Sequence, residues 1–146
     1  SNLKFISKLA RMTHRFSRLF FSMSTIPLLL IVDDSRTSRM LIRNQINRLR
    51  PNWRMIEASS GEESLSVIED QPPDFISMDV NMPGISGLEA AGHIRLKYPE
   101  VRIVLCTANI QESIRNAVAK ANIGFVSKPI TERSVIDSLA FWEQKI

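Results

Sequence analysis

Short, mostly apolar runs alternate with amphipathic segments along most of the chain. The apolar runs occupy residues 27–32, 53–58, 75–78, 101–106 and 123–127. Runs of this length, bounded by polar or turn-forming residues, are typical of strands that are buried on both faces of a sheet. They therefore predict a sheet that is covered on both sides.

The segments between these runs carry helix signals. Ser35 is a predicted N-cap, because its hydroxyl can accept a hydrogen bond from a free N–H of the first turn. Helices are expected from Ser35 to Pro51, from Ser60 to Pro72, and over about 86–97, 111–121 and 131–145. Five strand–helix units without a linker or an internal repeat predict one α/β domain with a parallel sheet and helices on both faces.

Polar residues follow four of the predicted strands. Asp33 and Asp34 follow the first strand, Asp79 the third, Thr107 the fourth and Lys128 the fifth. In an open parallel sheet, ligands bind beyond the carboxyl ends of the strands, so these side chains are expected to meet in one crevice. A set of carboxylates, a hydroxyl and an ammonium fits metal-assisted phosphoryl transfer onto Asp79.

Composition narrows the class of protein further. The chain has 146 residues, of which 44% are hydrophobic and 23% charged, as in soluble globular domains. No apolar run approaches the roughly 20 residues of a membrane-spanning helix. Cys106 is the only cysteine, so an internal disulfide is excluded. We expect a buried core thiol and a reducing, cytoplasmic compartment.

The basic charge of the chain is concentrated near its start. Residues 1–25 contain five Lys and Arg residues and no acid, which leaves 14 basic and 15 acidic residues in the remainder. Affinity for a phosphate backbone rests on clustered Lys and Arg, so a near-neutral domain is not expected to bind nucleic acid.

Residues 1–25 are expected to form a basic amphipathic extension outside the folded domain, which is assigned to 26–146. Apolar side chains recur in the extension at helical spacing, with the basic residues on the opposite stripe. Such a helix suits a membrane surface, an acidic groove or self-association. Met23 also fits a natural start of translation, in which case residues 1–22 would be non-native.

The ordered motifs resemble the receiver domain of two-component response regulators, the chemotaxis receivers among them. The matching residues are Val32–Ser35, Met78–Gly84, Gly87, Thr107–Ala108 and Lys128–Pro129. Five separated motifs agree in order and spacing over 26–146. The resemblance implies a flavodoxin-like, doubly wound, five-stranded parallel sheet of order 2-1-3-4-5.

The resemblance also implies a role for each carboxylate. Asp79 is expected to accept a phosphoryl group from a histidine kinase or a phosphotransfer protein. Mg²⁺ is the expected cofactor, with Asp34 and Asp79 as direct ligands, Asp33 acting largely through water, and Asn81 contributing its backbone carbonyl.

The remaining site residues are expected to sense the phosphoryl group. Lys128 would pair with one phosphoryl oxygen and Thr107 would donate its hydroxyl to another. Phe125, in the position where receivers more often carry tyrosine, is the expected aromatic switch residue. Pro129 is expected to follow a cis bond.

The expected function is that of a signalling switch that assists its own phosphorylation and dephosphorylation and is not a conventional enzyme. The chain is interpreted as a single-domain response regulator or an excised receiver. Its target protein is expected on the face made by the fourth helix, fifth strand and fifth helix of the domain.

Three other functions stay open from the sequence. One is a scaffold that acts by protein interaction without phosphorylation. A haloacid-dehalogenase-type phosphatase would need a second aspartate two residues after the nucleophile, where Asn81 stands. A flavodoxin-like electron carrier would have to bind its flavin phosphate beside Asp33 and Asp34, which would repel it.

Overall fold

Five parallel strands form the centre of the domain in this computed structural model, which describes residues 3–4, 26–109 and 111–145. The sheet order is β2-β1-β3-β4-β5, as predicted. The strands are β1 (Leu28–Val32), β2 (Arg54–Ala58), β3 (Phe75–Asp79), β4 (Arg102–Thr107) and β5 (Gly124–Ser127). Because β1 and β3 are neighbours at the centre, the residues that follow them lie side by side at the carboxyl edge.

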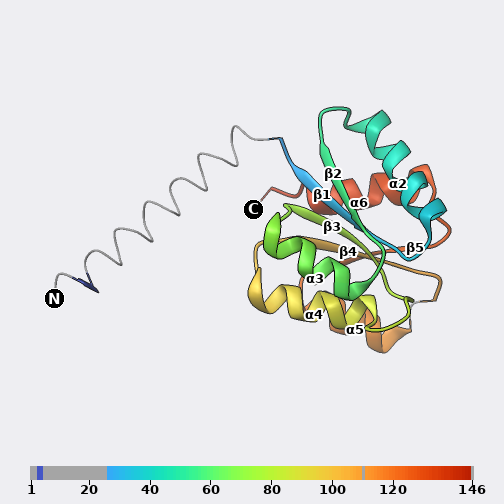
Figure 1. Ribbon diagram of the computed structural model, residues 1–146. Helices are drawn as coiled ribbons and strands as arrows, with labels where there is room; N and C mark the ends of the chain where they lie inside the picture. Colours follow the sequence, from blue (N-terminus) through green and yellow to red (C-terminus); the bar gives the residue numbers. More distant parts are fainter. Residues whose placement is uncertain (1–2, 5–25, 110, 146) are drawn as a thin grey trace.

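Helices cover both faces of this sheet (Figure 1). They are α2 (Arg36–Leu49), α3 (Gly61–Asp70), α4 (Gly87–Lys97), α5 (Glu112–Lys120) and α6 (Glu132–Trp142). Helices α2 and α6 lie on one face, and α3, α4 and α5 lie on the other. This arrangement confirms the doubly wound α/β fold.

Each face of the sheet has its own hydrophobic core. On the α3–α5 face, Ile68 and Ile94 are fully buried against the sheet. On the α2–α6 face, Ile46 and Trp142 occupy the same kind of position. The three inner strands β1, β3 and β4 are buried from both sides, which explains why their sequences read as nearly continuous apolar runs rather than as alternating ones.

Serine caps begin three of the helices. The side chains of Ser35, Ser60 and Ser86 accept hydrogen bonds from backbone N–H groups in the first turns of α2, α3 and α4. The last helix ends at Trp142, three residues before the predicted end at Lys145. The N–H of Glu143 turns back to the carbonyls of Leu139 and Phe141, which closes the helix there.

The amphipathic character expected of residues 1–25 falls almost wholly outside the described residues, so it stays a prediction. Within the described ranges, no helix is both long enough and apolar enough to cross a bilayer.

Candidate functional site

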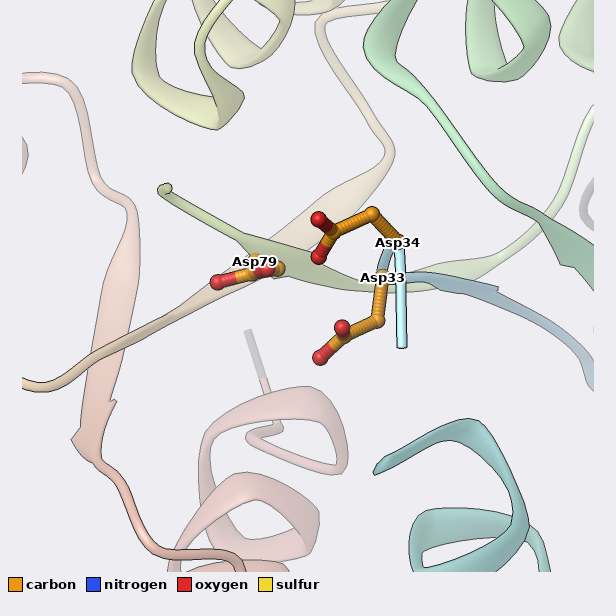
Figure 2. Close-up of side chains that lie close together, drawn as sticks. All are labelled: Asp33, Asp34 and Asp79. Atoms are coloured by element: carbon orange, nitrogen blue, oxygen red, sulfur yellow. The ribbon is translucent and has the colours of Figure 1, made fainter. Parts of the chain in front are cut away.

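Three aspartates gather beyond the carboxyl ends of the two central strands (Figure 2). Asp33 follows β1, Asp34 is the next residue, and Asp79 is the last residue of β3. One carboxylate oxygen from each lies within 4.8 Å of the others. Asp33 and Asp79 are buried, at 1% and 3% exposed, whereas Asp34 is exposed to solvent. The structure therefore brings together the three carboxylates that the sequence predicted to converge.

Local hydrogen bonds fix the carboxyl end of β1. One carboxylate oxygen of Asp33 accepts the N–H of Ser35 at 2.9 Å. The Arg39 guanidinium, one turn into α2, donates to the backbone carbonyl of Asp33 at 2.7 Å. These bonds hold the chain at the point where it leaves the sheet and enters α2.

Lys128 reaches the acidic cluster from the end of β5. Its Nζ lies 3.0 Å from Asp33 Oδ2 and 3.2 Å from Asp79 Oδ1. Its own N–H donates to the Thr107 carbonyl at 2.8 Å, which ties the residue to the end of β4. The Lys128–Pro129 bond is cis, as expected. One ammonium therefore bridges the two buried carboxylates.

The electrostatics of this cluster leave Asp79 poorly compensated. Burial, and then the nearby charge of Asp33, raise the pKa of Asp79 to about 6, although Lys128 acts in the opposite direction. Burial alone would lower the pKa of Lys128, but its hydrogen bond and ion pair with Asp33 raise that pKa above the ordinary value. The ammonium is thus firmly charged, and the pocket still has an excess of negative charge.

Thr107 lies at the same edge of the sheet but bonds within its own loop. It is the last residue of β4 and is buried. Its hydroxyl donates to the carbonyl of Asn109 at 3.0 Å, and the N–H of Asn109 approaches the Thr107 hydroxyl oxygen at 3.3 Å. The hydroxyl is therefore engaged away from the carboxylates in this conformation.

Phe125, the predicted switch residue on β5, lies at the surface. Its side chain is among the larger exposed apolar groups of the domain, at 37%. The guanidinium of Arg115 on α5 lies 5.3 Å from the centre of its ring, a cation–π distance. A cation from the neighbouring helix therefore lies over this partly exposed ring.

Asn81 is the second residue of the loop that leads from β3 to α4. Its N–H approaches Asp79 Oδ1 at 3.3 Å. Farther along, Gly87 packs so closely that an added Cβ would lie 1.9 Å from the Asp79 carbonyl oxygen. The start of α4 therefore rests directly on the backbone of the residue that the sequence predicts as phosphoacceptor.

Sequence reasoning missed several side chains around the site. Arg39, Arg115 and Glu62, which bonds the loop after β3, were not singled out. The Glu62 contact joins residues 23 positions apart, and no local pattern marks it. The available signal in the sequence was Gly84, because glycine readily adopts the positive φ that the loop has at this position.

Comparison with known proteins assigns this geometry to a family. Residues 29–140 match the response regulator receiver domain. The chemotaxis protein CheY of Listeria monocytogenes is 31% identical over 113 residues, which are 76% of this chain and 93% of that protein. The chain belongs to the family of response regulator receiver domains.

Solved structures agree with this assignment. The chemotaxis protein CheY4 of Vibrio cholerae has a TM-score of 0.71 at 23% identity, over 79% of this chain and 97% of CheY4, and so shares the fold. The response regulator TrrA of Thermotoga maritima was solved in complex with Mg²⁺ and BeF. It has a TM-score of 0.69 at 29% identity, over 80% of this chain and 99% of TrrA. The chain is a CheY-like receiver with an acidic pocket.

Proposed function

We propose that this receiver domain is a signalling switch that accepts a phosphoryl group on Asp79 from a histidine kinase or a phosphotransfer protein. The observation that carries the proposal is the position of Asp79, which is buried at the carboxyl edge of the sheet beside Asp33 and in contact with Lys128. A carboxylate that is both a nucleophile and a neighbour of a fixed cation is suited to forming an acyl phosphate.

The residues of the pocket fit a Mg²⁺ ion. Carboxylate oxygens of Asp33, Asp34 and Asp79 lie within 4.8 Å of one another, and hard oxygen ligands of this kind are those that Mg²⁺ prefers. We assign Asp34, Asp79 and the Asn81 carbonyl as direct ligands, with Asp33 acting largely through water. The bound ion would supply positive charge that offsets the repulsion between the carboxylates and an incoming phosphoryl group.

The chemical step uses Asp79 as the attacking group. One carboxylate oxygen forms a bond to phosphorus, while the bond from phosphorus to the donor's imidazole nitrogen breaks. The electron pair of the broken bond stays on the imidazole, which then takes up a proton. Lys128 Nζ, already 3.2 Å from Asp79 Oδ1, is placed to pair with a phosphoryl oxygen. Attack by water on phosphorus would later break the bond to the Asp79 oxygen, which restores the carboxylate and releases inorganic phosphate.

The phosphoryl group would be read out through Thr107 and Phe125. It adds about −1.5 to −2 charges and three acceptor oxygens, enough to draw the Thr107 hydroxyl away from Asn109. Space beneath the loop would then admit the Phe125 ring. Both residues lie in the conformation expected before that change, with the hydroxyl bonded in its own loop and the ring outward.

We place the downstream protein on the face formed by α5, β5 and α6. A surface hollow of about 350 Å³ opens there between β5 and α6, and Phe125 is one of its lining residues. An inward turn of the ring would change the shape of this hollow. We assign the basic extension 1–25 to association rather than to the switch, and we place the protein in the cytoplasm with its kinase.

Intact mass after incubation with Mg²⁺ and a small phosphodonor tests the proposal. The unaltered chain should gain one phosphoryl group, and Asp79→Asn should gain none. Asp70→Asn, which removes an exposed carboxylate at the end of α3, should behave as the unaltered chain does. A phosphorylated Asp79→Asn protein would contradict the assignment, and a chain that never gains mass would favour the scaffold function.

A further inference from the structure

A glutamate outside the acidic cluster hydrogen-bonds to the loop that contains Asn81, the proposed backbone ligand of the metal. The loop joins Asp79 at the end of β3 to Gly87 at the start of α4. Glu62, in the first turn of α3, accepts the N–H of Ile85 at 2.9 Å through its Oε1. Helix α3 therefore reaches across to a loop that follows a different strand.

The packing between α3 and this loop is close on two sides. Gly84 has a φ of +82°, and a Cβ at that position would lie 2.4 Å from Glu62 Oε1. In the other direction, a Cβ on Gly61 would lie 2.5 Å from a side-chain carbon of Ile85. The first turn of α3 and the loop after β3 are therefore in close contact.

Three further hydrogen bonds fix the two ends of the same loop. The Val80 N–H donates to the Cys106 carbonyl of β4 at 3.0 Å. The Asn81 N–H approaches Asp79 Oδ1 at 3.3 Å, and the Gly87 N–H donates to the Val80 carbonyl at 3.0 Å. Within the described residues, two side chains of other elements hydrogen-bond the stretch from Asn81 to Ile85: Asp79 at the adjoining end of β3 and Glu62 on α3. Only Glu62 comes from a distant part of the chain.

We propose that Glu62 is a positioning residue for the phosphorylation site: its carboxylate holds the 81–85 loop in the shape in which the Asn81 carbonyl can serve the metal. This inference rests on the proposed function for the identity of the metal site. It assigns to Glu62 no contact with the metal or with the phosphoryl group.

The charge state of Glu62 agrees with this task. Hydrogen bonding from the Ile85 backbone lowers the pKa of the Glu62 carboxyl, so the ionised acceptor is favoured. The Glu62 side chain is solvent-exposed and does not pack in the core, so replacing it with alanine leaves no buried cavity.

The neighbouring Glu63 offers a matched control. It lies in the same first turn of α3, and its carboxylate accepts the N–H and the hydroxyl of Ser59 at 2.9 and 2.7 Å. Glu63→Ala therefore removes a carboxylate from the same helix end without touching the loop. Glu62→Gln keeps an oxygen that can accept the Ile85 N–H.

The experiment compares Glu62→Ala, Glu62→Gln and Glu63→Ala with the unaltered chain. In metal-free protein, hydrogen exchange of the Ile85 amide should accelerate about three- to tenfold in Glu62→Ala, as expected for the loss of one hydrogen bond. Mg²⁺ affinity, followed by titration, should weaken by a similar factor. Glu62→Gln should restore most of both values, and Glu63→Ala should change neither.

Gly84→Ala disturbs the same contact from the loop side and should weaken Mg²⁺ binding in the same direction. Faster exchange at Ile85 with unchanged Mg²⁺ affinity in Glu62→Ala would overturn the proposal, because the bond would then be only structural. Equal losses in Glu62→Ala and Glu63→Ala would overturn it too. If the unaltered chain binds Mg²⁺ but never gains a phosphoryl group, the proposed function fails while the role of Glu62 is still decided by the titration.

Discussion

Asp79 carries its negative charge at an energetic cost in the metal-free protein. Burial and the neighbouring Asp33 raise its pKa to about 6, so the folded state favours the protonated carboxyl. The unfolded chain ionises this group at a pKa of about 3.9. Because the folded protein binds this proton more tightly, the contribution of Asp79 to the free energy of unfolding rises as the pH falls from above 6 towards 4.

Asp79→Asn should therefore stabilise the metal-free protein at pH 8, where the natural residue is charged. The advantage should shrink as the pH falls through about 6, because the carboxyl of the unaltered folded chain becomes neutral there. Thermal melts in the presence of a chelator, at a series of pH values, measure this. An advantage that is constant with pH, or a less stable variant at pH 8, would contradict the account of the pocket.

Arg115 is expected to hold the Phe125 ring outward. A cation–π contact at an exposed site contributes about 0.5–1 kcal/mol, so Arg115→Met should raise the inward population of the ring roughly two- to fivefold. Fluorine NMR of protein labelled with fluorophenylalanine reports the two positions, with Phe125→Leu to assign the signal.

Arg133→Met is the control for this measurement. Arg133 lines the same surface hollow as Phe125 but pairs with Asp137 at 3.2 Å. Arg133→Met should leave the inward population of the Phe125 ring unchanged. Equal responses of the two variants would show that general loss of positive charge, and not the contact with the ring, moves Phe125.

At the scale of elements, the junction between β3 and α4 determines where Asp79 lies. An added Cβ at Gly87 would lie 1.9 Å from the Asp79 carbonyl oxygen, so helix and strand could not keep their present approach. Gly87→Ala should lower the free energy of unfolding by about 1–3 kcal/mol and weaken Mg²⁺ binding. Denaturant melts and a Mg²⁺ titration check both effects.

Gly92 provides the comparison within the same helix. A Cβ there meets no atom within 4 Å, so Gly92→Ala should stabilise the protein by about 0.5–1 kcal/mol through helix propensity alone. Its Mg²⁺ affinity should equal that of the unaltered chain. If both alanine variants were equally stable, close packing at Gly87 would not be what positions the strand end.

The elements themselves were predictable because local sequence determines them. Short apolar runs predicted five strands, and Ser35 caps the start of α2 as expected. The end of α6 was less predictable, because polar residues from Glu143 onward could continue a helix or leave it. The convergence of Lys128 with Asp33, 95 positions apart, followed from the parallel topology once the strands were recognised.

Contacts between surface side chains of separate elements were not predictable in the same way. Glu62 and Arg115 each stand on a helix face where an exposed charged residue is ordinary. Only the fold places one beside the loop after β3 and the other over the ring of Phe125. The sequence therefore identified the chemical groups of the site but not the residues that hold the surrounding loop and ring.

At the scale of the whole molecule, the acidic pocket couples metal binding to stability. A ligand that binds only the folded state raises the melting temperature by mass action, so Mg²⁺ should stabilise the unaltered chain in a concentration-dependent way. Asp34→Ala should remove most of this effect, while the metal-free variant should melt at the same or a higher temperature because repulsion within the cluster is reduced. A Mg²⁺-dependent shift of unchanged size would exclude Asp34 as a ligand.

The proposed function requires that Asp79 itself becomes an acyl phosphate. Reduction with borohydride converts an aspartyl phosphate to homoserine, and peptide mass mapping then locates the altered residue. After incubation with Mg²⁺ and a small phosphodonor, we expect homoserine at position 79 and at no other aspartate, and none when Mg²⁺ is replaced by a chelator. Homoserine at Asp33 or Asp34, or an unmodified position 79 in a chain that has gained a phosphoryl group, would contradict it.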